Sequence, residues 1–146
     1  MKPRTCWPFL AKKAQEAVDE ILREVSEARQ KIDKTKKGRH RIREMIGIYK
    51  QRAEVRGKEI RNHSETANDR RFIVQLLELE ERVEKDVQDL ERSLEELLKK
   101  LRGAEVYRIK ITSLAEKDLQ AYRLHQSKLE QKQMDALGIT LFNLKS

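Results

Sequence analysis

Apolar residues recur every three or four positions along both halves of the chain, which is the spacing of one face of an α-helix. In the first half the repeat consists of Leu10, Ala14, Ala17, Ile21, Val25, Ala28, Ile32, Ile42, Ile46, Tyr49, Ala53 and Ile60. In the second half it consists of Phe72, Leu79, Val83, Val87, Leu90, Leu101, Ala104, Ile111, Ala115 and Tyr122. Each half therefore predicts one long helix with a narrow apolar stripe, the pattern of a coiled coil.

The two stripes match each other in reverse order. Pairing Tyr49 with Val83 also pairs Ile42 with Leu90, because the steps along one stripe are repeated backwards along the other. Such a match predicts an all-α fold, a long antiparallel two-helix coiled-coil hairpin whose turn lies at residues 62–67. Thr66 followed by Asp69 fits a capping box at the start of the second helix.

No proline interrupts these helices, because the two prolines, Pro3 and Pro8, both precede residue 9. We expect residues 1–8 to be a flexible lead and residues 9–134 to form the hairpin. Its first helix should end near Arg61, with Asn62 as terminator, and its second should begin at Ala67. We expect residues 135–146 to be a short apolar tail without a partner in the hairpin.

Some positions of the predicted seam are basic. In this pairing Arg39 faces Leu94, and Arg56 faces Leu76. An arginine stem can lie along apolar surface while its guanidinium reaches water, so these layers are compatible with a seam and weaken it.

The composition argues against catalysis. Charged residues make up 40% of the chain and aromatic residues 5%, which suits a thin seam better than a thick core with an enclosed cleft. The sequence contains no phosphate-binding loop, dinucleotide fingerprint or zinc-protease motif. His40, His63 and His125 are isolated, and Cys6 is the single cysteine. We therefore expect no enzyme activity, no cofactor, no metal site and a cytoplasmic location.

The net charge of +8 comes mainly from the first half of the chain. The densest basic run consists of Arg29, Lys31, Lys34, Lys36, Lys37, Arg39, Arg41 and Arg43. A basic coiled coil that binds nucleic acid is one interpretation. A solvated helix face is favoured, because no aromatic residues interleave the run to stack on bases. In this second interpretation Asp89, Glu91, Glu95 and Glu96 of the facing helix partly neutralise the run.

Two short motifs resemble the FliJ family, the small coiled-coil component of the flagellar type III export apparatus. One is Phe72-Ile73 with Leu76 and Leu79, just after the predicted turn. The other is the segment 129–136, whose Met134-Asp135 matches the family and whose Ala136 departs from it. The Tyr49 region also resembles the family, and the likeness extends over residues 9–143. The related injectisome component, the SctO (YscO/HrpO) group, has the same hairpin and role and remains the alternative to the flagellar branch.

This resemblance implies a stalk that couples the export ATPase hexamer to the export gate protein and also binds export chaperones. Residues 9–28 and 104–130 would bind the ATPase, and the protein would be peripherally associated with the membrane export apparatus. The pairing of the two stripes within one chain separately predicts a monomer. The residues that correspond to the family's gate contacts, together with two neighbours, are Ile42, Met45, Tyr49, Phe72, Ile73, Leu76, Leu77, Leu79 and Val83.

Packing within the seam explains part of this set equally well. Five of its members belong to the predicted stripes: Ile42, Tyr49, Phe72, Leu79 and Val83. Met45, Ile73 and Leu77 project away from the seam in our pairing, so we expect them to be the better candidates for a partner contact. Met45 stands where the family commonly has an aromatic residue.

Overall fold

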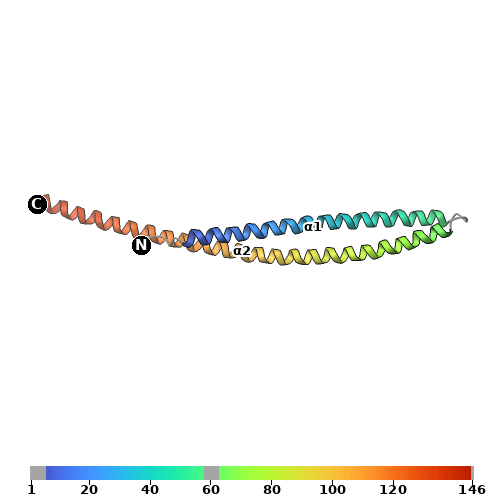
Figure 1. The fold of residues 1–146 in the computed structure, drawn as a ribbon. Helices are drawn as coiled ribbons and strands as arrows, with labels where there is room; N and C mark the ends of the chain where they lie inside the picture. Colours follow the sequence, from blue (N-terminus) through green and yellow to red (C-terminus); the bar gives the residue numbers. More distant parts are fainter. Residues whose placement is uncertain (1–5, 58–62, 146) are drawn as a thin grey trace. The chain divides into compact units, whose positions relative to one another are not determined.

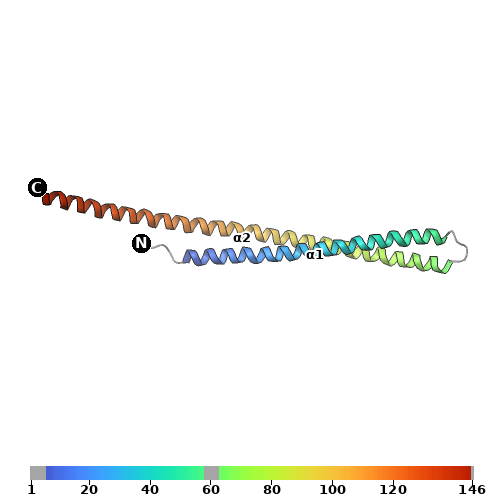
Figure 2. The same ribbon diagram turned by 90° about the horizontal axis from the view of Figure 1, so that it is seen from above.

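The computed structural model describes residues 6–57 and 63–145, which form a helical hairpin (Figures 1 and 2). Helix α1 runs from Cys6 to Gly57 and contains 52 residues. Helix α2 runs from His63 to Lys145 and contains 83 residues. The predicted fold class, an all-α helical hairpin, is confirmed. The expected helix end at Arg61, the terminator Asn62 and the seam residue Ile60 lie outside the described residues.

Helix α1 begins before its expected start at Phe9, so the predicted flexible lead is helical from Cys6 onwards. Pro8 does not prevent this, because it lies in the first turn of the helix. The first backbone N–H groups of a helix have no partner within it, so a residue without an N–H group is tolerated there.

Helix α2 begins at His63 rather than at Ala67, so the predicted turn at residues 62–67 and the capping box at Thr66 and Asp69 are wrong. Thr66 and Asp69 are both residues of the helix, and both are buried. The Asp69 carboxylate accepts a hydrogen bond from the Arg56 guanidinium at 3.1 Å. Asp69 is the seventh residue of α2, too far from its first residue to cap it, and its carboxylate instead binds Arg56 of α1.

Helix α2 also continues beyond its expected end at Met134, as far as Lys145. All side chains from Ser127 to Lys145 are exposed. The segment contains no proline, and a single glycine such as Gly138 costs a helix only about 1 kcal/mol relative to alanine. The predicted apolar tail is therefore a helical extension.

The described chain divides into two compact units. The middle unit, residues 21–100, contains the buried residues Val25, Ile32, Ile46, Leu76 and Val87. The terminal unit combines residues 6–20 of α1 with residues 101–145 of α2, and its buried residues are Ala14, Val18 and Ile111. Within each unit a segment of α1 lies beside a segment of α2.

The helix register in the middle unit differs from the predicted one. The ring of Tyr49 packs on Phe72 with centroids 4.6 Å apart, whereas we expected Val83 opposite Tyr49. The guanidinium of Arg39 reaches Glu84 rather than lying opposite Leu94. Both observed partners precede the expected ones by ten or eleven positions, about three turns of α-helix. A shift by whole turns leaves the same stripes facing each other, so the spacing of apolar residues does not distinguish the two registers.

At two seam positions the buried residue is not the one that the spacing predicts but another apolar residue close to it in the sequence. Leu76 is 5% exposed and belongs to the core, whereas the expected seam residue Leu79 is 42% exposed. In α1 the expected Ala17 is exposed and Val18 is buried in its place. Apolar residues occur on more than one side of the helix at both places, so alternative stripes of equal spacing could be drawn through them.

Candidate partner-binding surfaces

All nine predicted partner-binding residues lie in the middle unit, on the last turns of α1 and the first turns of α2. Ile42, Met45 and Tyr49 belong to α1, and the other six belong to α2. The structure separates them into three classes of burial. Leu76 is buried, and Met45, Leu77 and Leu79 are exposed. The half-buried members are Ile42, Tyr49, Phe72, Ile73 and Val83.

An aromatic pair joins the two helices at the centre of this set. The rings of Tyr49 and Phe72 are tilted by 54°, an arrangement between stacked and edge-to-face that is favourable for two rings at this distance. The guanidinium of Arg52 lies over the Tyr49 ring, 5.2 Å from its centroid. The pair holds α1 against α2, so Tyr49 and Phe72 have a packing role whether or not a partner also touches them.

The exposed members are the ones that a partner can reach without unfolding the hairpin. Met45 is 39% exposed and Leu77 is 44% exposed, as expected for residues outside the seam. Leu79 is also exposed, because Leu76 occupies the seam position that we expected for Leu79. Ile73, which we expected to project outward, is half-buried. Each of these exposed apolar side chains is a candidate contact point on a highly charged protein. Leu77 and Leu79 are two residues apart, so they point to different faces of α2.

Sequence reasoning missed other exposed aliphatic residues in this region, namely Ile48, Val55 and Val74. Ile48 follows Met45 by three residues, and Val55 follows Ile48 by seven, which places all three on one face of α1. This regular spacing was a usable signal. These residues lie off the stripe that forms the seam, so the seam pattern alone does not point to them.

Ion pairs between the helices neutralise one side of the basic run. Arg39 Nη1 lies 2.8 Å from Glu84, Arg43 Nε lies 3.4 Å from Glu80, and Lys36 Nζ lies 3.2 Å from Glu91. Of the acidic residues expected to do this, Glu91 is confirmed. Asp89 pairs instead with Arg92 of its own helix. The acidic residues that pair with the basic run therefore lie mainly in earlier turns of α2 than we expected, in keeping with the shifted register.

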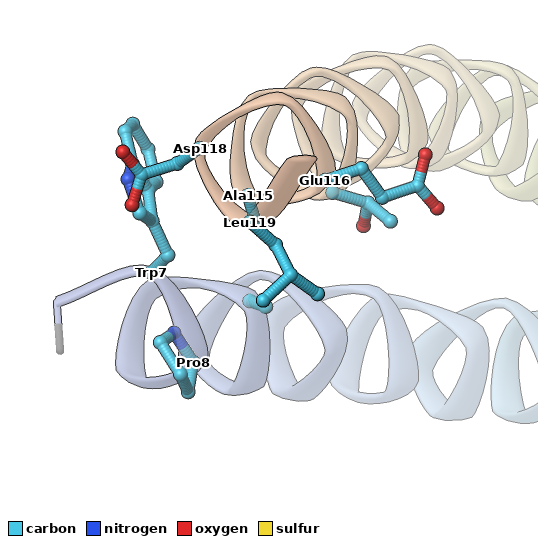
Figure 3. Close-up of a pocket in the computed structure, with 8 residues that line it drawn as sticks. Trp7, Pro8, Ala115, Glu116, Asp118 and Leu119 are labelled. Carbon is cyan, nitrogen blue, oxygen red and sulfur yellow. The ribbon is translucent and has the colours of Figure 1, made fainter. Parts of the chain in front are cut away.

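The terminal unit contains an apolar pocket of about 260 Å³ between the first turns of α1 and residues 112–119 of α2 (Figure 3). Trp7, Pro8 and Ala11 line it from α1. From α2 the side chain of Leu119 points toward α1, and Trp7 lies beside Asp118 at the pocket's rim. The pocket exists because the facing side chains, including Ala11 and Ala115, are too small to fill the space between the helices.

Beyond this pocket the last turns of α2 expose a row of apolar side chains: Met134, Leu137, Leu141 and Leu144. Their steps of three and four residues place them on one face of the helix. Phe142 and Ile139 add apolar surface on other faces. The row is a second surface on which a partner could pack.

Neither helix, over the residues described, is apolar enough along a sufficient length to cross a membrane. In residues 6–57 and 63–145, no three His, Cys, Asp or Glu side chains are arranged to hold a metal ion.

Comparison with known protein families identifies the chain. The model of the flagellar FliJ protein family matches residues 9–146, nearly the whole length. The chain belongs to the FliJ family. It is accordingly a component of the flagellar type III protein export machinery. No curated protein and no solved structure matches the chain.

Proposed function

We propose that this FliJ family protein is the non-catalytic stalk of a flagellar export apparatus, coupling the export ATPase hexamer to the cytoplasmic domain of the export gate protein. The observation that carries the proposal is the presence of exposed apolar surface on both compact units. The middle unit presents Met45, Leu77 and Leu79, and the terminal unit presents the row from Met134 to Leu144. A coupling protein needs two such surfaces, because it must hold two partners at once.

The terminal unit is the proposed ATPase-binding part. It contains both helix segments nearest the chain ends, residues 6–20 and 101–145. Exposed apolar residues such as Val106 and Ile109 lie among basic and acidic side chains there, a composition that suits contacts with several subunits of a ring. The helical extension of α2 adds surface that α1 does not cover, because α1 begins at Cys6.

The middle unit is the proposed gate-binding part. Met45, Leu77 and Leu79 are available on its surface, and Tyr49 and Phe72 hold the helices that carry them. Leu76 supports this surface from the core rather than touching the partner. In this proposal the protein acts as a monomer, associates with the membrane only through the gate, and also escorts export chaperones.

Two other functions remain as alternatives. The injectisome counterpart, the SctO group, shares the stalk role, and the match to the flagellar family model favours the flagellar branch. A nucleic-acid-binding role rests on the basic run alone. The ion pairs of Lys36, Arg39 and Arg43 with acidic residues of α2 weaken it, because those cations are already partly neutralised.

The test is direct binding of the full chain to the purified export ATPase and to the soluble domain of the gate, each measured by calorimetry. Binding to both partners with micromolar or better affinity supports the coupling role. Binding to neither, together with salt-sensitive binding to duplex DNA, contradicts it and favours the nucleic-acid interpretation. Binding to only one partner contradicts coupling and leaves a simple adaptor.

A further inference from the structure

The last turns of α2 combine a low charge with a row of exposed apolar side chains. Between residues 133 and 144 the only charged residue is Asp135, although charged residues make up 40% of the chain. The exposed fractions of Met134, Leu137, Leu141 and Leu144 lie between 58% and 78%. A helix in water gains nothing from such a row unless the row packs against another helix. The composition of this segment therefore points to a helical partner.

The same face of α2 is apolar at a second place in the terminal unit. The side of α2 that packs on α1 follows the seam spacing, with buried or half-buried residues at Leu101, Ala104, Arg108, Ile111, Ala115, Asp118 and Tyr122. Val106 lies midway between two of these positions, so it projects from the opposite side of the helix. Ile109 follows it by three residues, and both side chains are exposed. Val106 and Leu141 are separated by five heptads, so they lie on the same face of a coiled-coil helix.

We call this face the outer row of α2; its members are Val106, Ile109, Met134, Leu137, Leu141 and Leu144. The outer row matches itself in reverse order. Placing Ile109 of one copy opposite Leu141 of a second copy also places Val106 opposite Leu144, because the two steps are equal. Both contacts then occur twice, as an isologous interface with a two-fold axis requires. The axis passes close to Leu124, whose exposed side chain meets its own symmetry mate.

The centre of this antiparallel pairing is more polar than its two ends. Leu137 lies opposite Ser113, Met134 lies opposite the aliphatic stem of Glu116, and Gln120 lies opposite Glu130. Two small apolar clusters separated by polar layers form a weak interface, with an expected dissociation constant of about 10–100 μM. The chain is then a monomer in dilute solution and a dimer at high concentration.

We propose that two copies of the free chain pair antiparallel through the outer row of α2, with a two-fold axis close to Leu124. The dimer joins two hairpins that have each folded within one chain. This inference goes beyond the proposed function, in which the stalk acts as a monomer. The two agree because the dimer covers the row from Met134 to Leu144, which the proposed function assigns to the ATPase. A second copy and the ATPase ring therefore compete for this row.

Other occupants fit the outer row less well. A lipid surface binds amphipathic helices that carry Lys or Arg on the polar face, and residues 133–144 contain neither. Nucleic acid needs cations for its phosphates, so the same segment offers it nothing. Helix α1 of the same chain packs on the seam side of α2 and leaves the outer row exposed. A second copy supplies both an apolar face and the matching spacing.

The first experiment measures the molar mass of the full chain by sedimentation equilibrium, at concentrations from about 1 to 200 μM. The mass should rise toward that of a dimer. Leu141→Glu should weaken the association about tenfold or more, because it places a carboxylate between apolar side chains. Ile139→Glu is the matched control: Ile139 is 63% exposed and projects from another side of α2, so its substitution should leave the association unchanged. Equal effects of the two variants would overturn the proposed interface.

Disulfide trapping then tests the orientation, in a Cys6→Ser background at high protein concentration. Leu124→Cys should form a covalent dimer, because the residue lies beside its symmetry mate. Val106→Cys is equally accessible and should not, since the two copies of this residue are roughly 57 Å apart along an antiparallel pair. A covalent dimer through Val106→Cys would indicate a parallel pair and contradict the proposal. Circular dichroism checks that each variant keeps full helicity.

The outcomes separate this inference from the coupling role. If the chain stays monomeric at every concentration and Leu141→Glu weakens binding to the export ATPase, the outer row serves the ATPase alone. The inference is then wrong and the proposed function stands. If the chain dimerises as described and binds neither the ATPase nor the gate, the proposed function is wrong and the inference stands.

Discussion

The ring of Tyr49 on α1 packs against the ring of Phe72 on α2, with centroids 4.6 Å apart. This contact sets which turn of α1 faces which turn of α2 in the middle unit. The neighbouring ion pairs, Arg39 with Glu84 and Arg56 with Asp69, agree with the same register. Direct, long-range contacts of this kind decide the register, and each can be tested separately.

Disulfide trapping tests the register. In a Cys6→Ser background, Tyr49→Cys with Phe72→Cys should form an intramolecular disulfide, because their rings are in contact in the hairpin. Tyr49→Cys with Val83→Cys should not, since Val83 lies about three helical turns further along α2. Mobility on a non-reducing gel, with mass spectrometry of the linked peptides, distinguishes the two. Efficient trapping of the second pair alone would restore the register that the apolar spacing suggested.

The aromatic pair should stabilise the hairpin beyond the area that it buries. Phe72→Ala should lower the free energy of unfolding by about 2 kcal/mol, less than for a fully enclosed ring, because Phe72 is half-buried. A double-mutant cycle with Tyr49→Ala should give a coupling of about 0.5–1.5 kcal/mol. Urea unfolding followed by circular dichroism provides all four values. Strict additivity of the two substitutions would show that the rings stabilise the fold independently.

The burial difference between Leu76 and Leu77 predicts opposite effects for the same substitution. Leu76→Glu should unfold or strongly destabilise the hairpin, by about 3 kcal/mol or more, because it buries an unpaired carboxylate. Leu77→Glu should keep full helicity and weaken binding to the gate, as should Met45→Glu, since both residues are exposed. Helicity and gate affinity are measured on the same samples. Unchanged gate affinity for both exposed variants would remove them from the proposed contact.

The Arg56–Asp69 pair should matter more than an ordinary surface ion pair. The Asp69 side chain is 9% exposed, and Arg56 Nη1 lies 3.1 Å from it. Arg56→Leu leaves that carboxylate buried without this partner and should lower the free energy of unfolding by about 1.5–3 kcal/mol. The double variant Arg56→Leu, Asp69→Leu should recover much of the loss. Equal stability of the single variant and the unmodified chain would show that other groups satisfy Asp69.

The helical extension of α2 should be dispensable for folding. All side chains of residues 134–145 are exposed, so a chain that ends at Gln133 should keep its thermal unfolding midpoint to within about 2 °C. In the proposed function the same truncation weakens binding to the export ATPase, because it removes Met134, Leu137, Leu141 and Leu144. Thermal unfolding followed by circular dichroism gives the midpoint, and calorimetry gives the affinity for the ATPase. A large loss of stability would place these residues in the fold instead.

The resemblance to the FliJ family rests on local sequence features, and local features do not determine which residues of the site are buried. Met45 and Leu77 are exposed as the spacing predicted. The spacing predicts Leu79 in the seam, and the resemblance predicts both Leu76 and Leu79 as partner contacts, but Leu76 is buried and Leu79 is exposed. Between Leu76 and Leu79 the apolar residues cover more than one side of the helix, so only the packed position of α1 decides which of them is enclosed.

The sequence by itself determined that the chain is helical, that each helix has one apolar stripe, and that the two stripes pair in opposite directions. These properties depend on local propensity and on the spacing of apolar residues, which are fully present in a single chain segment. The axial register, the bounds of the helices and the burial of Leu76 were decided by the tertiary structure. A slide of one helix by about three turns brings the same stripes together again. The free-energy difference between such registers therefore comes from specific contacts between distant residues, such as Tyr49 with Phe72 and Arg39 with Glu84.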